Sequence, residues 1–380
     1  MNRAPNPWTL RLASAGIVLV VLGGAFAMLE KYVRSNRPEV VAHDAGDAPV
    51  ARARPTPHVD NPLEAGGLLI EDTPRGRRLI PGSRVVVRNH STSKRDVVIE
   101  INSSGFRDDE LSAFPAEDEY RVLALGDSIT WGDYLPAELV WVERVEAALA
   151  SAKDGARVEV VNAGIGNIGI IEEIDLLLDR GLALHPDLVL LAFYLNDSLP
   201  PQAFVRQLAE PGWLRQRSAL VDQVYRNAKL LSWSRGAGLN AMRWVPAVDQ
   251  LDWAHDRAAF GQLVESAAYD WGVAWRDESW IVVDAELEKL ATLARWRGFD
   301  VAIVFFPVKY QVEADFLEDT PQRRLAAKAA RLDFHYLDLL PMLRENRTTD
   351  LFFDHCHPRE VGNELLGLEI ARFLREKGLL

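Results

Sequence analysis

The hydrophobic pattern changes along the chain, and its most regular part begins after residue 118. Short continuous apolar runs, typical of buried strands, occur at residues 121–125, 158–161, 187–195 and 301–306. Apolar residues at helical spacing occupy residues 137–150, 170–184, 282–297, 321–331 and 358–376. Strands that alternate with helices predict an α/β fold over residues 119–380, with a doubly wound parallel sheet covered on both faces.

The pattern is weaker between residues 66 and 118. Three β-prone runs, at residues 68–70, 84–88 and 97–101, are separated by Pro-Gly and Asn/Ser clusters typical of hairpins. They predict a small β-rich module that is too short to be a separate enzyme. Residues 35–65 are rich in Pro, Ala and charged residues and have no apolar period, which predicts a linker.

The N-terminal region contains a run of 18 uncharged residues, from Leu12 to Leu29. A helix of this length reaches roughly 27 Å, close to the thickness of a bilayer core. We expect a transmembrane signal anchor within residues 1–34. Ala25-Phe26-Ala27 resembles a signal-peptidase site, so a cleaved signal peptide is an alternative, and a buried helix is another. The flanking basic residues do not orient the segment, although an isolated apolar segment at this place favours export.

Residues 200–280 interrupt the alternation of strands and helices with helical sequence rich in Arg and Trp. Seven of the 11 tryptophans of the chain lie there: Trp213, Trp233, Trp244, Trp253, Trp271, Trp275 and Trp280. They either pack a helical subdomain onto the α/β body or line a lid over a binding site. The sequence leaves both interpretations open.

Composition narrows the possible functions. The 380 residues include 55 Asp and Glu against 43 Lys and Arg, a formal charge of −12, and one cysteine. A single cysteine excludes an internal disulfide and leaves little for a thiolate zinc site. The acidic balance argues against nucleic acid as a partner, because binding there depends on basic residues that neutralise phosphates. A small or uncharged substrate fits better.

Polar motifs follow the predicted strands, at the edge where doubly wound sheets bind their ligands. They are Gly126-Asp127-Ser128-Ile129-Thr130-Trp131-Gly132, Asn162-Ala163-Gly164, Asn196-Asp197 and, before the last helix, Asp354-His355-Cys356-His357-Pro358. Each motif alone is an ordinary turn or helix cap. Four of them in this order at one sheet edge indicate a catalytic site.

In these motifs the chain resembles the SGNH (GDSL-like) hydrolase superfamily. The first, G-D-S-x-T-x-G, matches at every fixed position, and the last, D-x-x-H-P, is matched by Asp354, His357 and Pro358. The resemblance implies a flavodoxin-like sheet and a serine hydrolase without a cofactor. It implies that Ser128 is the nucleophile, His357 the general base and later acid, and Asp354 the group that orients the imidazole. The three-residue spacing agrees, since it places Asp354 beside His357, whereas His355 would point elsewhere.

The same resemblance implies an oxyanion hole formed by the backbone N–H groups of Ser128 and Gly164 and the side-chain amide of Asn196. Glycine allows close backbone approach, and the asparagine supplies a neutral donor worth roughly 3 to 4 kcal/mol at comparable sites. The chain departs from the family at Tyr194, where the third motif usually has glycine. A tyrosine there either turns away from the pocket or narrows it.

Two other interpretations compete for part of these residues. The run 164–169 is a G-x-G-x-x-G sequence after a strand and could bind a dinucleotide, but it lies on the second strand–helix unit and Asp197 follows late. The run 354–357 has the residue types of metal ligands, although adjacent residues rarely converge on one ion. Cys356 fits a small packing residue beside the site.

We therefore expect an exported or membrane-anchored serine esterase that hydrolyses an O-acyl ester through an acyl-enzyme. The expected substrate carries an acetyl group on a carbohydrate or cell-envelope glycan. An O-acyltransferase with the same triad and a non-catalytic glycan-binding or assembly protein are the alternatives. The catalytic domain would lie outside the cytoplasm, in the periplasm of a Gram-negative cell. No cofactor, metal or nucleic acid is expected, and the oligomeric state is left open.

Overall fold

The computed structural model describes residues 25–32, 58–59, 68–149, 155–199, 213–233 and 244–380. A five-stranded sheet forms its centre, with every pairing parallel and the strand order β10-β9-β8-β6-β7. The strands are β6 (Glu119–Gly126), β7 (Arg157–Gly164), β8 (Leu188–Tyr194), β9 (Asp300–Phe306) and β10 (His335–Asp338). In chain order this is the flavodoxin-like arrangement 2-1-3-4-5, so the predicted doubly wound parallel sheet is confirmed.

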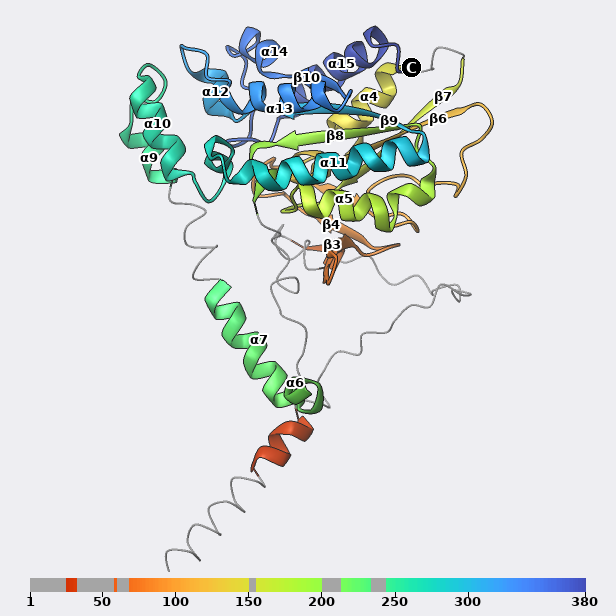
Figure 1. The fold of residues 1–380 in the computed structure, drawn as a ribbon, viewed down its shortest axis with the longest axis vertical. Helices are drawn as coiled ribbons and strands as arrows, with labels where there is room; N and C mark the ends of the chain where they lie inside the picture. The colour runs from red at the N-terminus through yellow and green to blue at the C-terminus, as the bar shows by residue number, and fades with distance from the viewer. Residues whose placement is uncertain (1–24, 33–57, 60–67, 150–154, 200–212, 234–243) are drawn as a thin grey trace, which may run out of the picture. The chain divides into compact units, whose positions relative to one another are not determined.

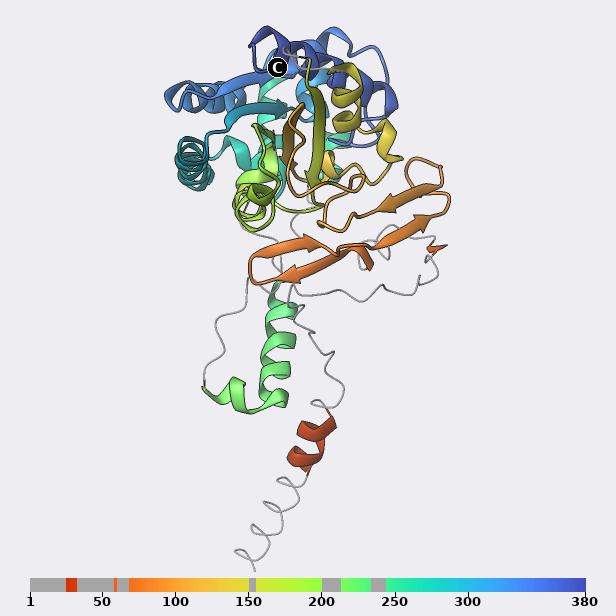
Figure 2. The same cartoon turned by 90° about the vertical axis from the view of Figure 1, so that its right-hand side faces the viewer.

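Helices cover both faces of the sheet (Figure 1, Figure 2). On one face, α4 (Trp141–Leu149) packs against the C-terminal helix α15 (Glu360–Glu376), and on the other α5 (Ile170–Asp179) packs against α11 (Ser279–Arg297). Cover on two sides explains why every residue of β8 is buried and why its sequence is continuously apolar.

Two predicted elements differ in detail from the observed ones. The helix expected over residues 170–184 ends at Asp179, and the 3₁₀ helix η2 (Gly181–Leu184) follows it. Gly181 marks this break because it packs tightly on β6, where an added Cβ would lie 2.6 Å from the Leu123 side chain. Strand β10 was not predicted, since its residues are all half-buried and show no alternation.

Shorter helices join the main elements. They are α3 (Ser128–Trp131), η1 (Ala137–Leu139), η3 (Leu195–Ser198), α12 (Lys309–Glu313), α13 (Thr320–Arg331) and α14 (Leu340–Glu345). Of these, α3 and η3 follow β6 and β8 directly, so they begin at the sheet edge where the polar motifs lie.

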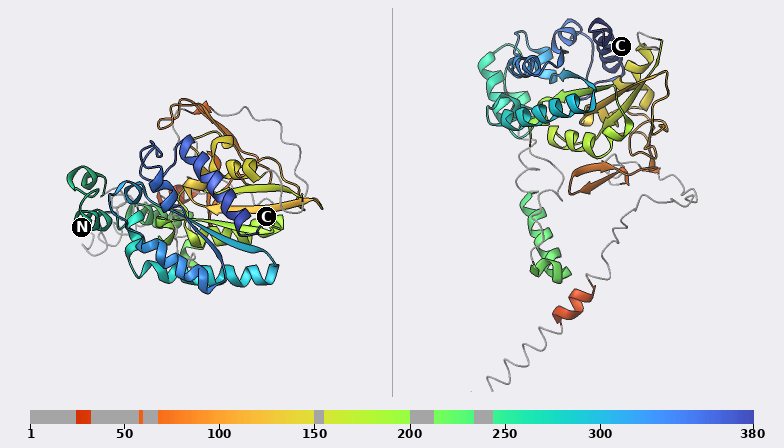
Figure 3. Two further views of the ribbon diagram at one scale, coloured as in Figure 1. Left: turned by 90° about the horizontal axis from the view of Figure 1, so that it is seen from above. Right: turned by 45° about the vertical axis from the view of Figure 1, so that its right-hand side comes forward.

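The β-rich module is present and packs against the catalytic body (Figure 3). Strands β2 (Ile70–Thr73) and β3 (Gly76–Leu79) form a hairpin, and β4 (Arg84–Val87) and β5 (Val97–Glu100) form a second sheet with β1 (His58–Val59). The basic sequence of β3 hid it from the hydrophobic pattern, yet Arg78 is 1% exposed and pairs with Asp179 of α5 at 3.2 Å. Module and catalytic domain therefore form one compact unit with a shared core.

A second compact unit contains residues 1–54 and 207–236. Its described parts are a helix of residues 25–32, α6 (Trp213–Arg217) and α7 (Ala219–Trp233). The Glu30 carboxylate accepts hydrogen bonds from the Ser218 hydroxyl at 2.8 Å and from the N–H groups of Ala219 and Leu220 at 2.8 and 2.9 Å. These bonds cap the N-terminus of α7.

Most of the apolar run at residues 12–29 and of the expected linker at residues 35–65 lies outside the described residues. Within the described part of the chain, no helix combines the length and the apolar character needed to cross a bilayer.

The Trp-rich insertion, for which the sequence left a packed subdomain and a lid open, is divided between the two units. Its second half, with α9 (Val245–Gln250), α10 (Arg257–Ser266) and η6 (Trp271–Trp275), belongs to the catalytic unit. The packing interpretation is confirmed for Trp271 and Trp280, which are 0% and 4% exposed, whereas Trp213 in the first half is 65% exposed. The aromatic residues of the insertion thus do not act as one surface.

Candidate active site

The nucleophile candidate stands at the start of a short helix that follows the central strand. Ser128 is the first residue of α3, and Asp127 caps this helix by accepting a hydrogen bond from the Ile129 N–H at 2.9 Å. The turn is tight because α3 presses against β7: an added Cβ on Gly164 would lie 2.2 Å from the Trp131 backbone nitrogen. This packing fixes the nucleophile at the point where the strand order reverses.

The structure brings Ser128, His357 and Asp354 into one hydrogen-bonded chain. The Ser128 Oγ and His357 Nε2 atoms are 2.9 Å apart, and His357 Nδ1 lies 2.8 Å from Asp354 Oδ2. The other carboxylate oxygen, Oδ1, accepts the backbone N–H groups of Cys356 and His357, each at 2.9 Å. The loop thus holds the carboxylate, the carboxylate orients the imidazole, and the imidazole faces the hydroxyl.

The charges of the triad support this assignment of roles. Burial alone would raise the pKa of Asp354, but the hydrogen bonds from His357 and the loop, together with the charge of His357, hold that pKa well below its ordinary value. Burial opposes the imidazolium, yet the hydrogen bond and charge of Asp354 outweigh it and raise the pKa of His357 above 6.5. His357 is therefore a stronger base than a free histidine and remains paired with an ionised carboxylate.

The hydrogen bonds around Gly164 and Asn196 do not test their expected roles as oxyanion-hole donors. The Gly164 N–H donates to the Asn162 Oδ1 atom at 3.0 Å, and the Asn162 amide donates to the Thr130 carbonyl at 2.9 Å. Gly164 therefore has no free donor in this arrangement, and its role in an oxyanion hole stays a prediction. Asn196 is half-buried in η3 at the same sheet edge, and its Oδ1 atom is buried without a hydrogen-bond partner among the described residues. Its role also stays a prediction.

Tyr194 turns away from solvent and lies beneath the catalytic loop. It is 0% exposed at the end of β8, and burial followed by the nearby Cys356 raises its pKa well above the ordinary value. Burial likewise raises the pKa of the Cys356 thiol, which lies 3.5 Å from His357 Nδ1. Both side chains therefore fill space behind the histidine as neutral groups, and the tyrosine does not narrow the exposed site.

Three carboxyl groups lie buried below the nucleophile. Asp127, Glu173 and Asp197 are 2%, 0% and 0% exposed, and both carboxylate oxygens of Glu173 lack a hydrogen-bond partner among the described residues. Burial raises the pKa of Asp127 to about 6, with the Ile129 N–H opposing it. The pKa of Glu173 and that of Asp197 are raised by burial first and then by the neighbouring carboxylates. The three groups cannot all be ionised at neutral pH.

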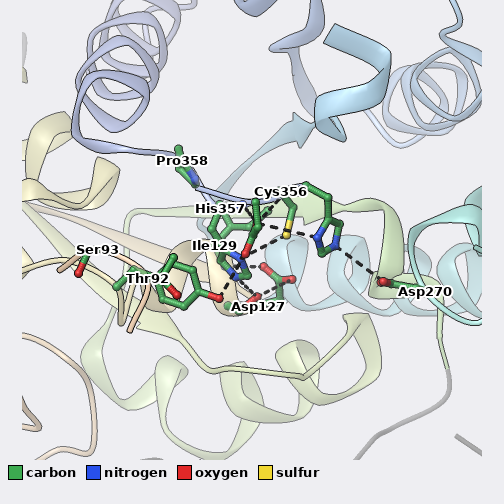
Figure 4. A network of polar contacts seen from close by, with 12 residues as sticks. Thr92, Ser93, Asp127, Ile129, Asp270, Cys356, His357 and Pro358 are labelled. Carbon is green, nitrogen blue, oxygen red and sulfur yellow. Dashed lines mark hydrogen bonds and ion pairs between the residues drawn. The ribbon is translucent and has the colours of Figure 1, made fainter. Parts of the chain in front are cut away.

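Sequence reasoning missed two partners of the catalytic loop (Figure 4). Tyr134 donates its hydroxyl to Asp354 Oδ2 at 3.3 Å. Asp270 lies 3.7 Å from His355 Nε2 and accepts the Trp244 indole N–H at 2.9 Å. Figure 4 shows Asp270 on one side of the network and Thr92 and Ser93 of the β module on the other. His355, as expected, points elsewhere, toward Asp270. These partners carry no signal in the sequence, because they are far from the loop along the chain.

The competing motifs have identifiable structural roles. Gly169 begins α5 so close to η3 that an added Cβ would lie 2.6 Å from the Asp197 carbonyl oxygen, so this glycine serves close packing at the site. Ligand atoms of Asp354, Cys356 and His357 all lie within 4.8 Å of one another. A metal ion bound there would compete for the Asp354–His357 hydrogen bond, which the triad uses.

No protein-family profile matches the chain, and no curated protein is similar to it in sequence. Several solved structures resemble it. A protein described as lipolytic and of the G-D-S-L family, from Desulfitobacterium hafniense, is 16% identical over 67% of this chain and 99% of its own, with a TM-score of 0.35. A catalytic mutant of an acetylxylan esterase from Geobacillus stearothermophilus is 15% identical over 70% of this chain and 96% of its own, with a TM-score of 0.38.

A second variant of that acetylxylan esterase is 13% identical over 69% of this chain and 97% of its own, with a TM-score of 0.41. At such scores the likeness assigns neither activity nor substrate to this chain, so both are argued from the side chains of the site.

Proposed function

We propose that this protein is a serine esterase that hydrolyses an O-acyl ester through an acyl-enzyme. The observation that carries the proposal is the continuous hydrogen-bonded chain from Ser128 through His357 to Asp354. A serine hydroxyl is a weak nucleophile at neutral pH unless an oriented base takes its proton, and this chain supplies such a base.

The reaction follows from the positions of the three groups. Ser128 Oγ attacks the carbonyl carbon of the ester while His357 Nε2 takes the hydroxyl proton, and the carbonyl oxygen becomes an oxyanion. His357 then gives that proton to the departing alcohol oxygen as the C–O bond breaks, which leaves an acyl-serine. Water repeats the attack with His357 as base, and the acid and free Ser128 are released. Asp354 stabilises the imidazolium in both halves without taking its proton.

The charges around the triad favour an uncharged substrate. Asp127 and Asp133 both raise the pKa of His357 through their charge, and Asp270 lies beside His355, so an anionic ester would be repelled. The indole ring of Trp244 lies 4.7 Å from the ring of His355 but is 5% exposed, so it packs behind the loop and offers little surface to a substrate. For the uncharged ester we expect an acetyl or other short acyl group on a carbohydrate or cell-envelope glycan. An acyltransferase would differ only in replacing the attacking water by an acceptor hydroxyl.

We further propose that the N-terminal apolar run is kept as a membrane anchor and that the catalytic domain lies outside the cytoplasm. The helix of residues 25–32 continues the apolar run and spans the small residues at 25–27, and its Glu30 caps α7. Proteolysis requires an extended backbone, and residues 25–27 are helical here. We expect the mature protein to sediment with membranes and to keep residues 1–27, as read by intact mass. A mature N-terminus at Met28 would contradict the anchor.

The test of the esterase is hydrolysis of short p-nitrophenyl esters together with labelling by a fluorophosphonate. Wild-type protein should turn over the ester and become labelled at Ser128, and both signals should disappear in Ser128→Ala. His357→Ala should lose activity by roughly 10⁴- to 10⁶-fold. Wild-type protein that neither hydrolyses nor becomes labelled would contradict the esterase, and glycan binding without turnover would then favour a binding protein. Acylated glycan formed from an acyl donor would identify a transferase.

A further inference from the structure

We propose that Tyr134 is a positioning residue for the Asp354–His357 pair and that the N-terminal β module holds it in place, so that the module is part of the catalytic site. This inference rests on the proposed esterase function. It assigns a catalytic purpose to residues 84–107, which the sequence had indicated only as a small accessory module.

Tyr134 contacts both members of the pair that activates the serine. Its hydroxyl donates to Asp354 Oδ2 at 3.3 Å, the same oxygen that His357 Nδ1 approaches at 2.8 Å. Its ring lies 4.5 Å from the imidazole of His357 with an interplanar angle of 38°. The hydroxyl thus fixes the carboxylate, and the ring supports the imidazole and stabilises it when it becomes an imidazolium.

The β module reaches the loop of Tyr134 through a buried arginine. Arg107 is 2% exposed, and its guanidinium donates to the carbonyl oxygens of Trp131 at 2.5 Å and Leu135 at 2.7 Å. These carbonyls lie on either side of Tyr134 in the sequence. Gly132, with a φ of 65°, turns the chain out of α3 between them, so the arginine bridges the exit of the nucleophile helix. The hydrogen bonds that Arg107 donates to these two carbonyl oxygens offset the cost of burying its charge.

The loop between β4 and β5 packs against Tyr134 itself. His90 is 1% exposed, and its ring lies 5.0 Å from the ring of Tyr134. Its Nδ1 atom accepts the N–H groups of Thr92 at 3.2 Å and Ser93 at 3.4 Å, which fixes the imidazole as a neutral tautomer with its proton on Nε2. The loop therefore offers Tyr134 a rigid surface and no competing charge.

A third contact ties the same loop to the segment that carries the base. Arg95 forms an ion pair with Glu360 at 2.6 Å, and Glu360 is the first residue of α15, three positions after His357. Arg107, His90 and Arg95 thus connect the module to both catalytic loops, the one after Ser128 and the one around His357. Their common effect is to keep Tyr134 against Asp354.

The pH dependence of kcat/KM can show whether Tyr134 positions the Asp354–His357 pair or only supports the fold. The Tyr134 hydroxyl offsets part of the negative charge of Asp354, so removing it should strengthen the pull of Asp354 on the His357 proton. The other charged or titratable groups that face His357, namely Asp127, Asp133, His355 and Cys356, are unchanged by this substitution. Tyr134→Phe should therefore move the acid limb of kcat/KM to higher pH and lower kcat/KM about three- to tenfold at pH 6. Tyr134→Leu also loses the ring and should lose more than tenfold.

The matched control is Tyr336→Phe, which removes a hydroxyl bonded to the Gln322 carbonyl at 3.0 Å. The contact of the module is tested by Arg95→Gln, since the Arg95 side chain is 51% exposed and can be changed without disturbing the core. We expect Tyr336→Phe to match wild type and Arg95→Gln to lower kcat about two- to threefold with KM unchanged. Histidine NMR, with His357→Ala to assign the signal, reads the same pKa changes without turnover. If Tyr134→Phe and Arg95→Gln both keep the wild-type rate, pH profile and His357 titration, the proposal is wrong. If wild type hydrolyses no ester but the titration shifts as expected, the esterase fails and the positioning contact stands.

Discussion

Asp354 and a cluster of three other carboxyl groups lie near Ser128, and their pKa values are shifted in opposite directions. Asp354 meets an imidazole, a tyrosine hydroxyl and two backbone N–H groups, and its pKa is well below the ordinary value. Asp127, Glu173 and Asp197 meet few donors and one another, and their pKa values are raised. Asp354 is also less buried, since its side chain is 31% exposed whereas the other three residues are at most 2% exposed, so access to solvent and the number of donors together keep it an anion.

The sharpest test of this comparison removes the charge from each group in turn. In Asp354→Asn the amide would face His357 Nδ1 and favour the tautomer that carries its proton on Nε2, which cannot accept the serine proton. We expect kcat to fall about 10³- to 10⁴-fold. Asp127→Asn should cost less than tenfold, because an amide oxygen still accepts the Ile129 N–H. Equal losses in the two variants, measured with p-nitrophenyl acetate, would remove the distinction between the groups.

The oxyanion side can be tested with two neighbouring residues of η3. Asn196→Ala should lower kcat about 10²-fold with little change in thermal stability, because the amide acts only when charge develops on the substrate. Ser198→Ala removes a buried hydroxyl without a partner among the described residues and should leave kcat near wild type. A stable Asn196→Ala variant with full activity would exclude Asn196 as the donor.

The glycine-rich loop offers a matched pair of small changes. Gly169→Ala would place a methyl group 2.6 Å from the Asp197 carbonyl oxygen, whereas at Gly166 the nearest atom would lie 3.7 Å away. We expect Gly169→Ala to destabilise the protein by about 1 to 3 kcal/mol and Gly166→Ala to be tolerated. Chemical denaturation of the two variants measures this difference, and equal stabilities would show that α5 can move away from η3.

The smallest effect concerns stability against pH. A carboxyl whose pKa is raised in the folded protein, as that of Glu173 is from 4.5, stabilises the fold fully below 4.5 and loses that contribution as the pH rises through the folded value. Glu173→Gln imitates the protonated acid and should raise Tm by about 2 to 4 °C at pH 8, with little change at pH 4. The exposed Glu117→Gln serves as control. A decrease in Tm at both pH values would mean that the anion is needed.

The parts of the fold that could be predicted are those with a continuous local signal. The apolar runs predicted four of the five central strands, and the motifs around Ser128 and His357 predicted residues that the structure brings within 2.9 Å. Strand β10 was not predicted, because an edge strand whose residues are all half-buried shows little alternation of hydrophobic and polar residues. Strand β3 escaped because its core-facing residue is an arginine, which a hydrophobic pattern reads as exposed.

The missed parts of the site have a different cause. Tyr134 and Asp354 are 220 positions apart, and Arg107 acts on carbonyl oxygens, which every residue has. The residue types involved do not predict these contacts, because the contacts form only where the folded backbone brings the two distant segments together. The role of Gly164 stays a prediction, because its N–H donates to the Asn162 side chain two positions earlier.

The ion pair between Arg95 and Glu360 also has a meaning for the order in which the molecule forms. During synthesis the β4–β5 hairpin leaves the ribosome long before α15 exists, and its partner lies near the very end of the chain. Contacts of such sequence separation form late because the intervening chain must be closed first. The nucleophile loop can thus be complete while its base is still unattached. A chain without α15 would lack the helix that packs on α4 and covers one face of the sheet, so activity would begin only when α15 docks.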